Sequence, residues 1–212
     1  YGQLGDGKKI YNEDYQQGIH RTEPGEVAGL YNVMYISAGP TNAAAIKNDG
    51  TVWLWGANSP SLFGAALKDN TTTPLSVAVP HEIQGIKNVS EVKLGSGHAI
   101  ALKDDGTVWA WGSNNYGQLG VPDKTISYSP IKVPGLTNVK AISAGNEHSV
   151  ALESNGTVWA WGQNKYGQLG DGTASDKNTP VRVPLPPIKA ISARGFNTMA
   201  LDYNGTIWIW GN

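Results

Sequence analysis

Residues 154–162 read S-N-G-T-V-W-A-W-G, and the phrase recurs as N-D-G-T-V-W-L-W-G from Asn48, D-D-G-T-V-W-A-W-G from Asp104 and Y-N-G-T-I-W-I-W-G from Tyr203. The four copies hold all eight tryptophans of the 212-residue chain. The second tryptophan recurs at intervals of 56, 50 and 49 residues. Such periods are typical of propellers and solenoids, in which a repeat buries its faces against its neighbours. We therefore expect one repeat array over residues 1–212, with repeats at about 1–55, 56–111, 112–161 and 162–212.

Each copy of the phrase predicts a β-hairpin. Its centre is Asp-Gly or Asn-Gly, which favours a two-residue type I′ turn with positive φ at both positions. In the strand after the turn, the tryptophans stand two residues apart and share one face of the sheet. Further strands are expected at 33–37, 89–93, 139–143 and 188–192, and at 130–133 and 180–183. Four short antiparallel strands in about 50 residues make one propeller blade.

The predicted fold class is therefore all-β, a β-propeller of four-stranded antiparallel blades with four repeats present. The end of the chain would run into its beginning almost in phase with the repeat. We therefore expect a partial propeller, or a ring completed by further repeats or by another chain, with self-association as one route to closure.

A second motif, N-x-Y-G-Q-L-G, occupies residues 114–120 and 164–170, and residues 1–5 read Y-G-Q-L-G. Its leucines are expected to plug the space between blades, its glutamines to satisfy loop backbone groups, and its glycines to provide tight turns. The motif is degenerate at residues 61–64, S-L-F-G, where Leu62 and Phe63 can still act as plugs.

The stretch I-S-A-G-N-E-H-S-V-A-L at residues 142–152, followed by N-G-T-V-W-A-W-G and N-x-Y-G-Q-L-G-D-G-T, resembles the regulator-of-chromosome-condensation repeat family. The likeness covers essentially the whole chain and indicates a bacterial-type member or a fragment. It implies a β-propeller of four-stranded blades, closed by seven repeats in most members. The histidine of the G-x-x-H motif is present as His98 and His148 and is replaced by Asn42 and Asn197.

The repeated aromatic and imidazole side chains are expected to be structural. An aromatic ring buries roughly 150–250 Å², so the tryptophan pairs are interpreted as blade-to-blade packing, and a carbohydrate-stacking platform is the alternative. Trp159→Ala is accordingly expected to cost about 3–5 kcal/mol. The imidazoles are expected to hydrogen-bond neighbouring backbone rather than bind a metal. The predicted packing set is Trp53, Trp55, Trp109, Trp111, Trp159, Trp161, Trp208, Trp210, His98 and His148.

Composition and motifs argue against several functions. Sixteen Lys and Arg against seventeen Asp and Glu give a net charge of −1, which does not attract nucleic acid. The chain has no cysteine and no apolar run of about 20 residues, the length needed for membrane insertion. Common nucleophile, phosphate-loop, zinc and dinucleotide motifs are absent. We therefore expect no catalytic residues, no metal, no cofactor and no enzyme activity.

The acidic stretch at residues 171–176 lacks the alternating ligands and terminal Glu of a calcium loop. It is interpreted as a solvated turn. The near-neutral, cysteine-free, Asn/Thr/Gly-rich composition suits an extracellular or cell-surface protein, although the sequence does not fix the compartment.

The repeats differ most in one loop. From the last glycine of Y-G-Q-L-G to the proline that opens the next strand, repeat one spans nineteen residues and the other repeats span ten. Tyrosine and arginine on a loop held by a rigid sheet are favoured interface anchors, and a longer solvated loop is the alternative. The predicted partner-binding residues are Lys8, Lys9, Tyr11, Asp14, Tyr15, His20 and Arg21. A second insertion, of six residues, lies around 80–85.

These observations predict a non-enzymatic protein–protein interaction scaffold that binds a protein partner of unknown identity through rim loops. Two alternatives stay open. The resemblance allows a guanine-nucleotide exchange factor-like regulator of a small GTPase, because some family members act in this way through a projecting loop. The other is a carbohydrate-binding or inhibitor module of a secreted or surface protein.

Overall fold

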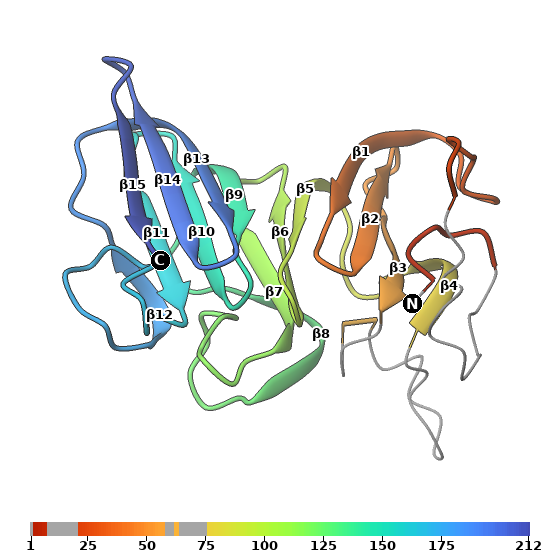
Figure 1. Ribbon diagram of the computed structural model, residues 1–212, viewed down its shortest axis with the longest axis horizontal. Helices are drawn as coiled ribbons and strands as arrows, with labels where there is room; N and C mark the ends of the chain where they lie inside the picture. The colour runs from red at the N-terminus through yellow and green to blue at the C-terminus, as the bar shows by residue number, and fades with distance from the viewer. Residues whose placement is uncertain (1, 8–20, 58–61, 64–75) are drawn as a thin grey trace.

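The computed structural model describes residues 2–7, 21–57, 62–63 and 76–212, which form four antiparallel sheets (Figure 1). Three sheets have four strands and the fourth has three. The first blade comprises β1 (Val33–Ala38), β2 (Asn42–Lys47), β3 (Val52–Ala57) and β4 (Ser76–Glu82), and the second β5 (Val89–Leu94), β6 (His98–Lys103), β7 (Val108–Ser113) and β8 (Ile126–Lys132). The third comprises β9 (Val139–Ala144), β10 (His148–Glu153), β11 (Val158–Gly162) and β12 (Lys177–Arg182), and the fourth β13 (Ile188–Arg194), β14 (Asn197–Asp202) and β15 (Ile207–Gly211).

Strand order within each sheet follows the chain, so every blade is an up-and-down meander. The sheets lie side by side in sequence order (Figure 1). The first strands β1, β5, β9 and β13 contact one another in succession and form the inner side of the array. This is the all-β propeller-blade arrangement predicted from the repeats. Within the described residues, no helix has the length and hydrophobicity to cross a membrane.

The four hairpins form where they were predicted, but the predicted turn type was wrong. Gly50 N–H donates to the Lys47 carbonyl (2.8 Å) and Lys47 N–H donates to the Thr51 carbonyl (3.0 Å). Only the glycine has positive φ in each turn, 73°, 76°, 90° and 86° at Gly50, Gly106, Gly156 and Gly205. The loops therefore have three residues, a type I turn followed by a left-handed glycine. Asp49 Oδ1 stabilises this loop by accepting both the N–H and the hydroxyl of Thr51 (3.0 and 2.6 Å).

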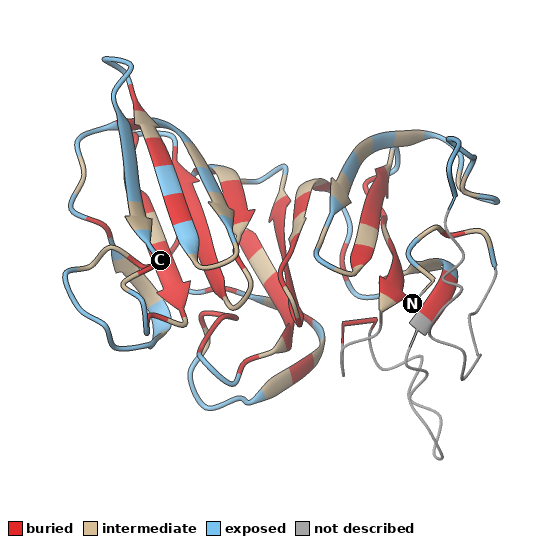
Figure 2. Ribbon diagram, in the orientation of Figure 1, coloured by how far each residue is buried: buried red, intermediate tan, exposed pale blue. Residues whose placement is uncertain are grey.

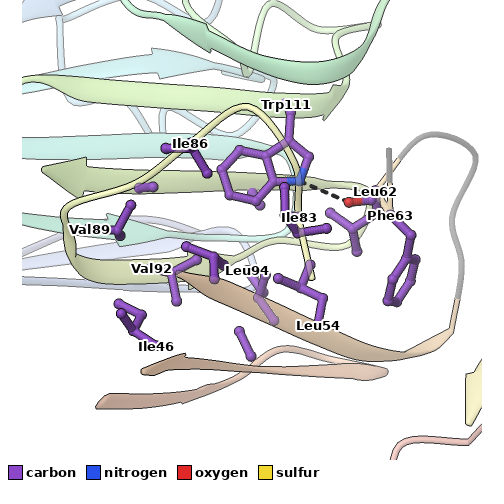
Figure 3. Close-up of a cluster of buried hydrophobic side chains, with 14 of the residues drawn as sticks. Ile46, Leu54, Leu62, Phe63, Ile83, Ile86, Val89, Val92, Leu94 and Trp111 are labelled. Carbon is purple, nitrogen blue, oxygen red and sulfur yellow. Dashed lines mark hydrogen bonds between the residues drawn. The ribbon is translucent and has the colours of Figure 1, made fainter. Parts of the chain in front are cut away.

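The core lies between blades rather than within them. Each cluster combines the tryptophan-free face of one blade with the tryptophan-bearing face of the next. Figure 3 shows the first cluster, which holds Trp111 of the second blade beside Leu62 and, lower in the view, Leu54 and Ile46 of the first blade. Leu62 and Phe63 complete it at 0% and 1% exposure. The predicted plugs are confirmed here, and fully buried Leu119 and Leu169 take the same place in the other clusters.

A polar cluster on the inner strands ties three blades together. Glu91 of β5 accepts the Tyr35 hydroxyl of β1 through Oε1 (3.2 Å) and the backbone N–H of Ile142 in β9 through Oε2 (3.1 Å). Lys93 Nζ lies 3.1 Å from Glu91 Oε1 and 2.7 Å from the Tyr35 hydroxyl. Partial burial raises the pKa of Tyr35, and its hydrogen bond from Lys93 opposes that effect. The cluster therefore satisfies polar groups on the inner strands while it links their blades.

Candidate functional site

The blades present two different rims. The tight β2–β3 turns and their equivalents form one, which we call the hairpin rim. The β1–β2 turn and its equivalents, with the long β7–β8 and β11–β12 loops, form the other, the loop rim. In Figure 1 the β14–β15 turn lies at the top, and the loops that follow β7 and β11 lie toward the bottom. Long loops on a rigid scaffold are where binding residues concentrate, so the loop rim is the candidate functional surface.

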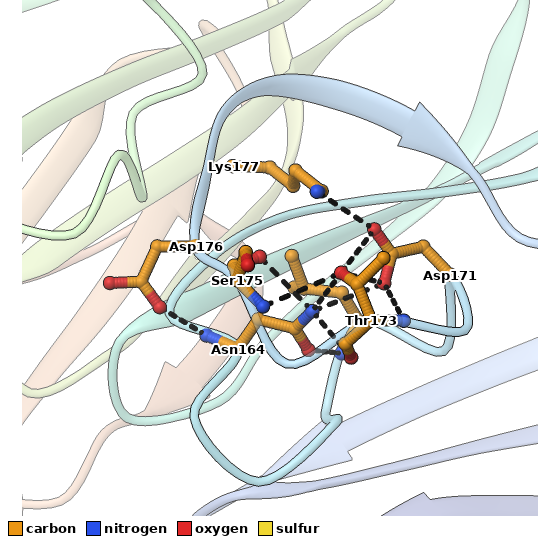
Figure 4. Close-up of polar contacts among 7 residues, drawn as sticks. Asn164, Asp171, Thr173, Ser175, Asp176 and Lys177 are labelled. Carbon is orange, nitrogen blue, oxygen red and sulfur yellow. Dashed lines mark hydrogen bonds and ion pairs between the residues drawn. The ribbon is translucent and has the colours of Figure 1, made fainter.

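A single asparagine organises each of the two described long loops, β7–β8 and β11–β12. Asn164 Nδ2 donates to Asp171 Oδ1 (3.1 Å) and to the carbonyls of Thr173 and Ser175 (3.0 and 3.1 Å), as Figure 4 shows. Its Oδ1 accepts the Leu169 N–H (2.9 Å). Asn114 does the same in the preceding blade, through the carbonyls of Val121 and Lys124 and the N–H of Leu119. The first residue of N-x-Y-G-Q-L-G therefore fixes the whole loop.

The acidic stretch after this motif is structural. Asp171 accepts the Thr173 N–H and hydroxyl (2.9 and 2.7 Å) and pairs with Lys177 (3.3 Å). Burial of the Asp171 carboxylate acts to raise its pKa, but these hydrogen bonds outweigh burial and hold the pKa below its ordinary value. Within the described part of the chain, no cluster of three or more His, Cys, Asp or Glu side chains could hold a metal ion.

The motif glutamines also fix the loops, as predicted. Gln118 and Gln168 are both 0% exposed, and their Oε1 atoms accept the backbone N–H groups of Tyr116 and Tyr166, each at 2.9 Å. Gln118 Nε2 donates to Glu147 Oε2 at 2.5 Å. Burial raises the pKa of Glu147, and the bond from Gln118 lowers it in part. The two tyrosines are therefore held by buried amides while their rings face outward.

These loops form a pocket on the loop rim. Its volume is about 470 Å³, and its lining comes from three blades: Tyr116, Gln163, Lys165, Tyr166, Ala174, Asp176 and Phe196. Tyr116 and Tyr166 are 40% and 42% exposed. The Tyr166 and Phe196 rings are tilted against each other, with centroids 5.2 Å apart. The pocket joins two exposed tyrosines and the partly buried Phe196 to one cation, one carboxylate and one amide.

The sequence did not single out this pocket. Tyr116 and Tyr166 belong to a recurring motif, and periodic residues were interpreted as scaffold. Phe196 stands where the other blades have Thr41, Gly97 and Glu147, and this departure was the available signal.

The buried histidines link neighbouring blades. His98 Nε2 lies 3.0 Å from Ser149 Oγ, and Ser149 Oγ donates to the Gln118 carbonyl (2.8 Å). His148 and Thr198 repeat the arrangement one blade later (2.9 Å). Because the Ser149 hydroxyl already donates its proton to the Gln118 carbonyl, His98 Nε2 must be the donor, and the buried Nδ1 of His98 has no hydrogen-bond partner among the described residues. The predicted bond to backbone was wrong, since the partner is a hydroxyl of the next blade.

Burial keeps both imidazoles neutral. It lowers the pKa of His98 from 6.5 to about 3, with a smaller contribution from the nearby His148. Burial likewise lowers the pKa of His148 to about 4. The G-x-x-H glycine makes room for the ring, because a Cβ on Gly95 would lie 2.2 Å from His98 Cε1. These contacts give the histidines an architectural role.

The two tryptophans of each phrase have separate roles. The Nε1 atom of the second donates to a carbonyl in the segment that precedes its own blade, in the pairs Trp55–Gln3 (3.0 Å), Trp111–Leu62 (2.8 Å), Trp161–Gln118 (2.9 Å) and Trp210–Gln168 (2.9 Å). The first binds its own hairpin, in Trp53–Thr51 (3.0 Å), Trp109–Thr107 (3.2 Å) and Trp208–Asp202 (3.2 Å). Of the eight rings, all described, only Trp208 reaches the exposed range, at 39%. Exposed rings were the requirement of a sugar-stacking platform, so these tryptophans do not support one.

The predicted partner-binding insertion is only partly visible. Lys8, Lys9, Tyr11, Asp14, Tyr15 and His20 lie outside the described residues. Arg21 Nη2 lies 3.3 Å from Asp6 Oδ2, so an ion pair joins the two ends of the insertion.

The family comparison covers the whole chain. The family described as the RCC1-like domain matches residues 1–212. The chain belongs to the RCC1-like domain family. A crystal structure of Kap60 bound to yeast RCC1 has the same fold (TM-score 0.73, 23% identity), and the match covers 85% of this chain and 44% of that one. Human WBSCR16 superposes with a TM-score of 0.71 at 29% identity, over 84% of this chain and 46% of that one.

Among curated RCC1-like proteins, the X-linked retinitis pigmentosa GTPase regulator homolog of Caenorhabditis elegans is 38% identical over 93 residues. That match covers 44% of this chain and 6% of the nematode protein. The chain therefore spans less than half of each of these relatives. They are eukaryotic, so they do not support the expected bacterial origin, and the extracellular or surface location stays a prediction.

Proposed function

We propose that this RCC1-like array is a non-enzymatic protein-binding module whose partner docks on the loop rim at the Tyr116–Tyr166–Phe196 pocket. The observation that carries the proposal is this aromatic pocket, assembled from three blades and open to solvent. Aromatic residues that fill or line a pocket dominate the binding energy of many protein interfaces. In the hairpin turns, Asp49 and Asp105 bond the threonines of their own turns, whereas Tyr116 and Tyr166 of the loop rim are exposed beside Phe196.

The scaffold prepares this surface for binding. Asn164 and Gln168 fix the backbone that carries Tyr166, and Asn114 and Gln118 fix that of Tyr116. A partner therefore loses little binding energy to ordering of the loops. The pocket offers both charges, on Lys165 and Asp176, which suits a mixed polar and apolar protein surface better than a uniformly charged ligand.

The pocket gives the first prediction. Tyr166→Ala should weaken partner binding by about 10- to 100-fold, because a hot-spot residue contributes about 2 kcal/mol or more and each 1.4 kcal/mol is tenfold. Capture from native extract, with identification by mass spectrometry, followed by titration of the purified partner, measures the effect. Tyr203→Ala is the matched control, because Tyr203 is 61% exposed on the hairpin rim. The proposal fails if Tyr203→Ala abolishes binding and Tyr166→Ala leaves it unchanged.

The insertion of repeat one is proposed as a second contact. Deletion of residues 8–17 should leave the thermal unfolding midpoint within a few degrees of the parent, because the Asp6–Arg21 ion pair lies outside the deletion. The same deletion should reduce capture of the partner. Circular dichroism melts and the capture assay measure the two effects, and full capture by the deletion variant would leave the pocket as the binding site.

A small GTPase is a specific candidate for the partner. The support is the nematode relative, whose name describes a GTPase regulator. Release of a fluorescent guanine nucleotide from purified GTPases, with and without this chain, tests the exchange activity that the family resemblance suggested. Acceleration that Tyr166→Ala removes would support both the partner and the surface.

A further inference from the structure

Two asparagines of the chain precede a glycine, and both lie in hairpin turns. They are Asn155, between β10 and β11, and Asn204, between β14 and β15. The first two hairpins have Asp49 and Asp105 at the same position. All four residues are exposed, and Figure 2 shows the exposed β14–β15 turn at the top of the fourth blade. The hairpin rim therefore presents two Asn-Gly pairs to water.

An asparagine that precedes glycine can lose its side-chain amide without an enzyme. The backbone nitrogen of the glycine attacks Cγ of the asparagine, a C–N bond forms, the Cγ–Nδ2 bond breaks and ammonia leaves. Glycine favours this step because it has no Cβ to crowd the approach. Water then opens the cyclic imide at either carbonyl carbon. The products are aspartate and isoaspartate, and isoaspartate adds a methylene group to the backbone.

In the first three hairpins, the side chain before the glycine is fixed to its own turn. Its Oδ1 atom accepts the backbone N–H of the threonine that follows the glycine. These bonds are Thr51–Asp49 (3.0 Å), Thr107–Asp105 (3.0 Å) and Thr157–Asn155 (2.8 Å). Asn155 Nδ2 also donates to Glu153 Oε2 (3.4 Å). The two bonds of the Asn155 amide restrict the rotation that brings its Cγ onto the Gly156 nitrogen.

The fourth hairpin gives this role to a different residue. Asp202 Oδ1 accepts the backbone N–H groups of Asn204 and Thr206, each at 2.9 Å. Asp202 Oδ2 accepts Trp208 Nε1 (3.2 Å). The equivalents of Asp202 in the other hairpins are Lys47, Lys103 and Glu153. Because Asp202 bonds the threonine, the side chain of Asn204 has no hydrogen-bond partner among the described residues.

The attacking nitrogen is also held least firmly in the fourth hairpin. Gly205 N–H donates to the Asp202 carbonyl at 3.3 Å. The equivalent bonds of the other hairpins are 2.8 Å at Gly50, 2.9 Å at Gly106 and 2.9 Å at Gly156. A hydrogen bond beyond the usual range of N–H···O distances is a weaker one. Both partners of the reaction are therefore less restrained at Asn204 than at Asn155.

We propose that Asn204 is a site of spontaneous deamidation and that Asn155 is protected by its hairpin. The reaction consumes the amide and water and forms a carboxylic acid and ammonia, with no change of oxidation state. Aspartate at this position reproduces the residue type of the first two hairpins. Isoaspartate lengthens the backbone of a three-residue loop and is a substrate for isoaspartyl methyltransferases. The site lies on the hairpin rim, so this proposal is independent of partner binding on the loop rim.

Peptide mapping by mass spectrometry tests this proposal on the 212-residue chain after incubation in mildly alkaline buffer. The peptide with Asn204 should show the mass change from amide to acid about tenfold faster than the peptide with Asn155, because about 1.4 kcal/mol is a factor of ten and hydrogen bonds of this scale restrain Asn155. Methyl transfer by an isoaspartyl methyltransferase identifies isoaspartate in the same peptide. Equal rates at the two asparagines would overturn the proposal, as would a folded chain in which Asn204 does not convert.

Two variants and an unfolded reference isolate the role of the hairpin. Asp202→Glu introduces the residue type of Glu153, so Asn204 should bond Thr206 and its conversion should slow several-fold. Tyr203→Ser, which introduces the residue type of the third hairpin beside an unchanged Asp202, is the matched control and should keep the fast conversion. In guanidinium chloride the two asparagines should convert at similar rates, because both precede glycine. A tenfold ratio that persists in the unfolded chain would overturn the assignment to the hairpin.

Discussion

Trp161→Ala is expected to lower the free energy of unfolding by about 3–5 kcal/mol, the usual cost of truncating a large aromatic side chain in a core. Trp161 is 0% exposed and packs in the cluster that joins the second and third blades. Its Nε1 donates to the Gln118 carbonyl (2.9 Å), which also accepts the Ser149 hydroxyl (2.8 Å). That carbonyl keeps one partner in the variant, so the cost comes mainly from the cavity.

Urea titration followed by circular dichroism measures this loss, and two variants separate its sources. Trp161→Phe retains much of the packing but loses the hydrogen bond to the Gln118 carbonyl. We expect the lost bond to cost about 1 kcal/mol, in addition to the cost of the smaller ring. Trp159→Ala should cost less than Trp161→Ala, because Trp159 is only partly buried and its Nε1 has no partner among the described residues. The expected loss is about 1–3 kcal/mol, which revises the value of about 3–5 kcal/mol expected from the sequence. Equal losses at the two positions would contradict the separate roles of the paired tryptophans.

This ranking shows what the sequence could not resolve within a predicted hairpin. Trp159 and Trp161 share a strand and a face, and the sequence phrase treats them alike. Only the loop of the preceding blade distinguishes them, because its Gln118 carbonyl lies beside Trp161. Similarly, Asp-Gly suggested a type I′ turn, whereas the bonds from Thr51 to Asp49 accompany a three-residue loop. Local patterns predicted the strands and their order, and side-chain bonding decided the details.

The candidate site was harder to predict because it is assembled between repeats. The tyrosines of N-x-Y-G-Q-L-G were visible as a motif, but their exposure depends on how buried Gln118 and Gln168 hold the loops. Phe196 joins Tyr166 only because adjacent blades bring residues 30 positions apart into contact. The insertion was conspicuous as a difference in length, which is why the sequence favoured it over a pocket built from periodic residues.

Acidification from pH 7 to pH 4.5 is expected to remove about 4–5 kcal/mol of stability through His98 and His148. Burial lowers their pKa values to about 3 and about 4 in the folded protein, from an ordinary value of 6.5. The unfolded chain therefore takes up two protons in this window while the folded chain takes up almost none. Stability is present in full above pH 6.5 and is lost as pH falls toward the folded pKa values, at about 1.4 kcal/mol per pH unit for each histidine.

The double variant His98→Asn/His148→Asn isolates this effect, because asparagine occupies the same position at buried Asn42. It should be less stable than the parent at pH 7, since it loses two inter-blade bonds, but its stability should change little down to pH 4.5. Glu147 acts in the opposite direction, because its raised pKa lets the folded state take up a proton first. Asp49, Asp105 and Asp202 have lowered pKa values, so their stabilisation is lost only near and below pH 3.8. A double variant that keeps the pH dependence of the parent would show that the buried imidazoles are not its source.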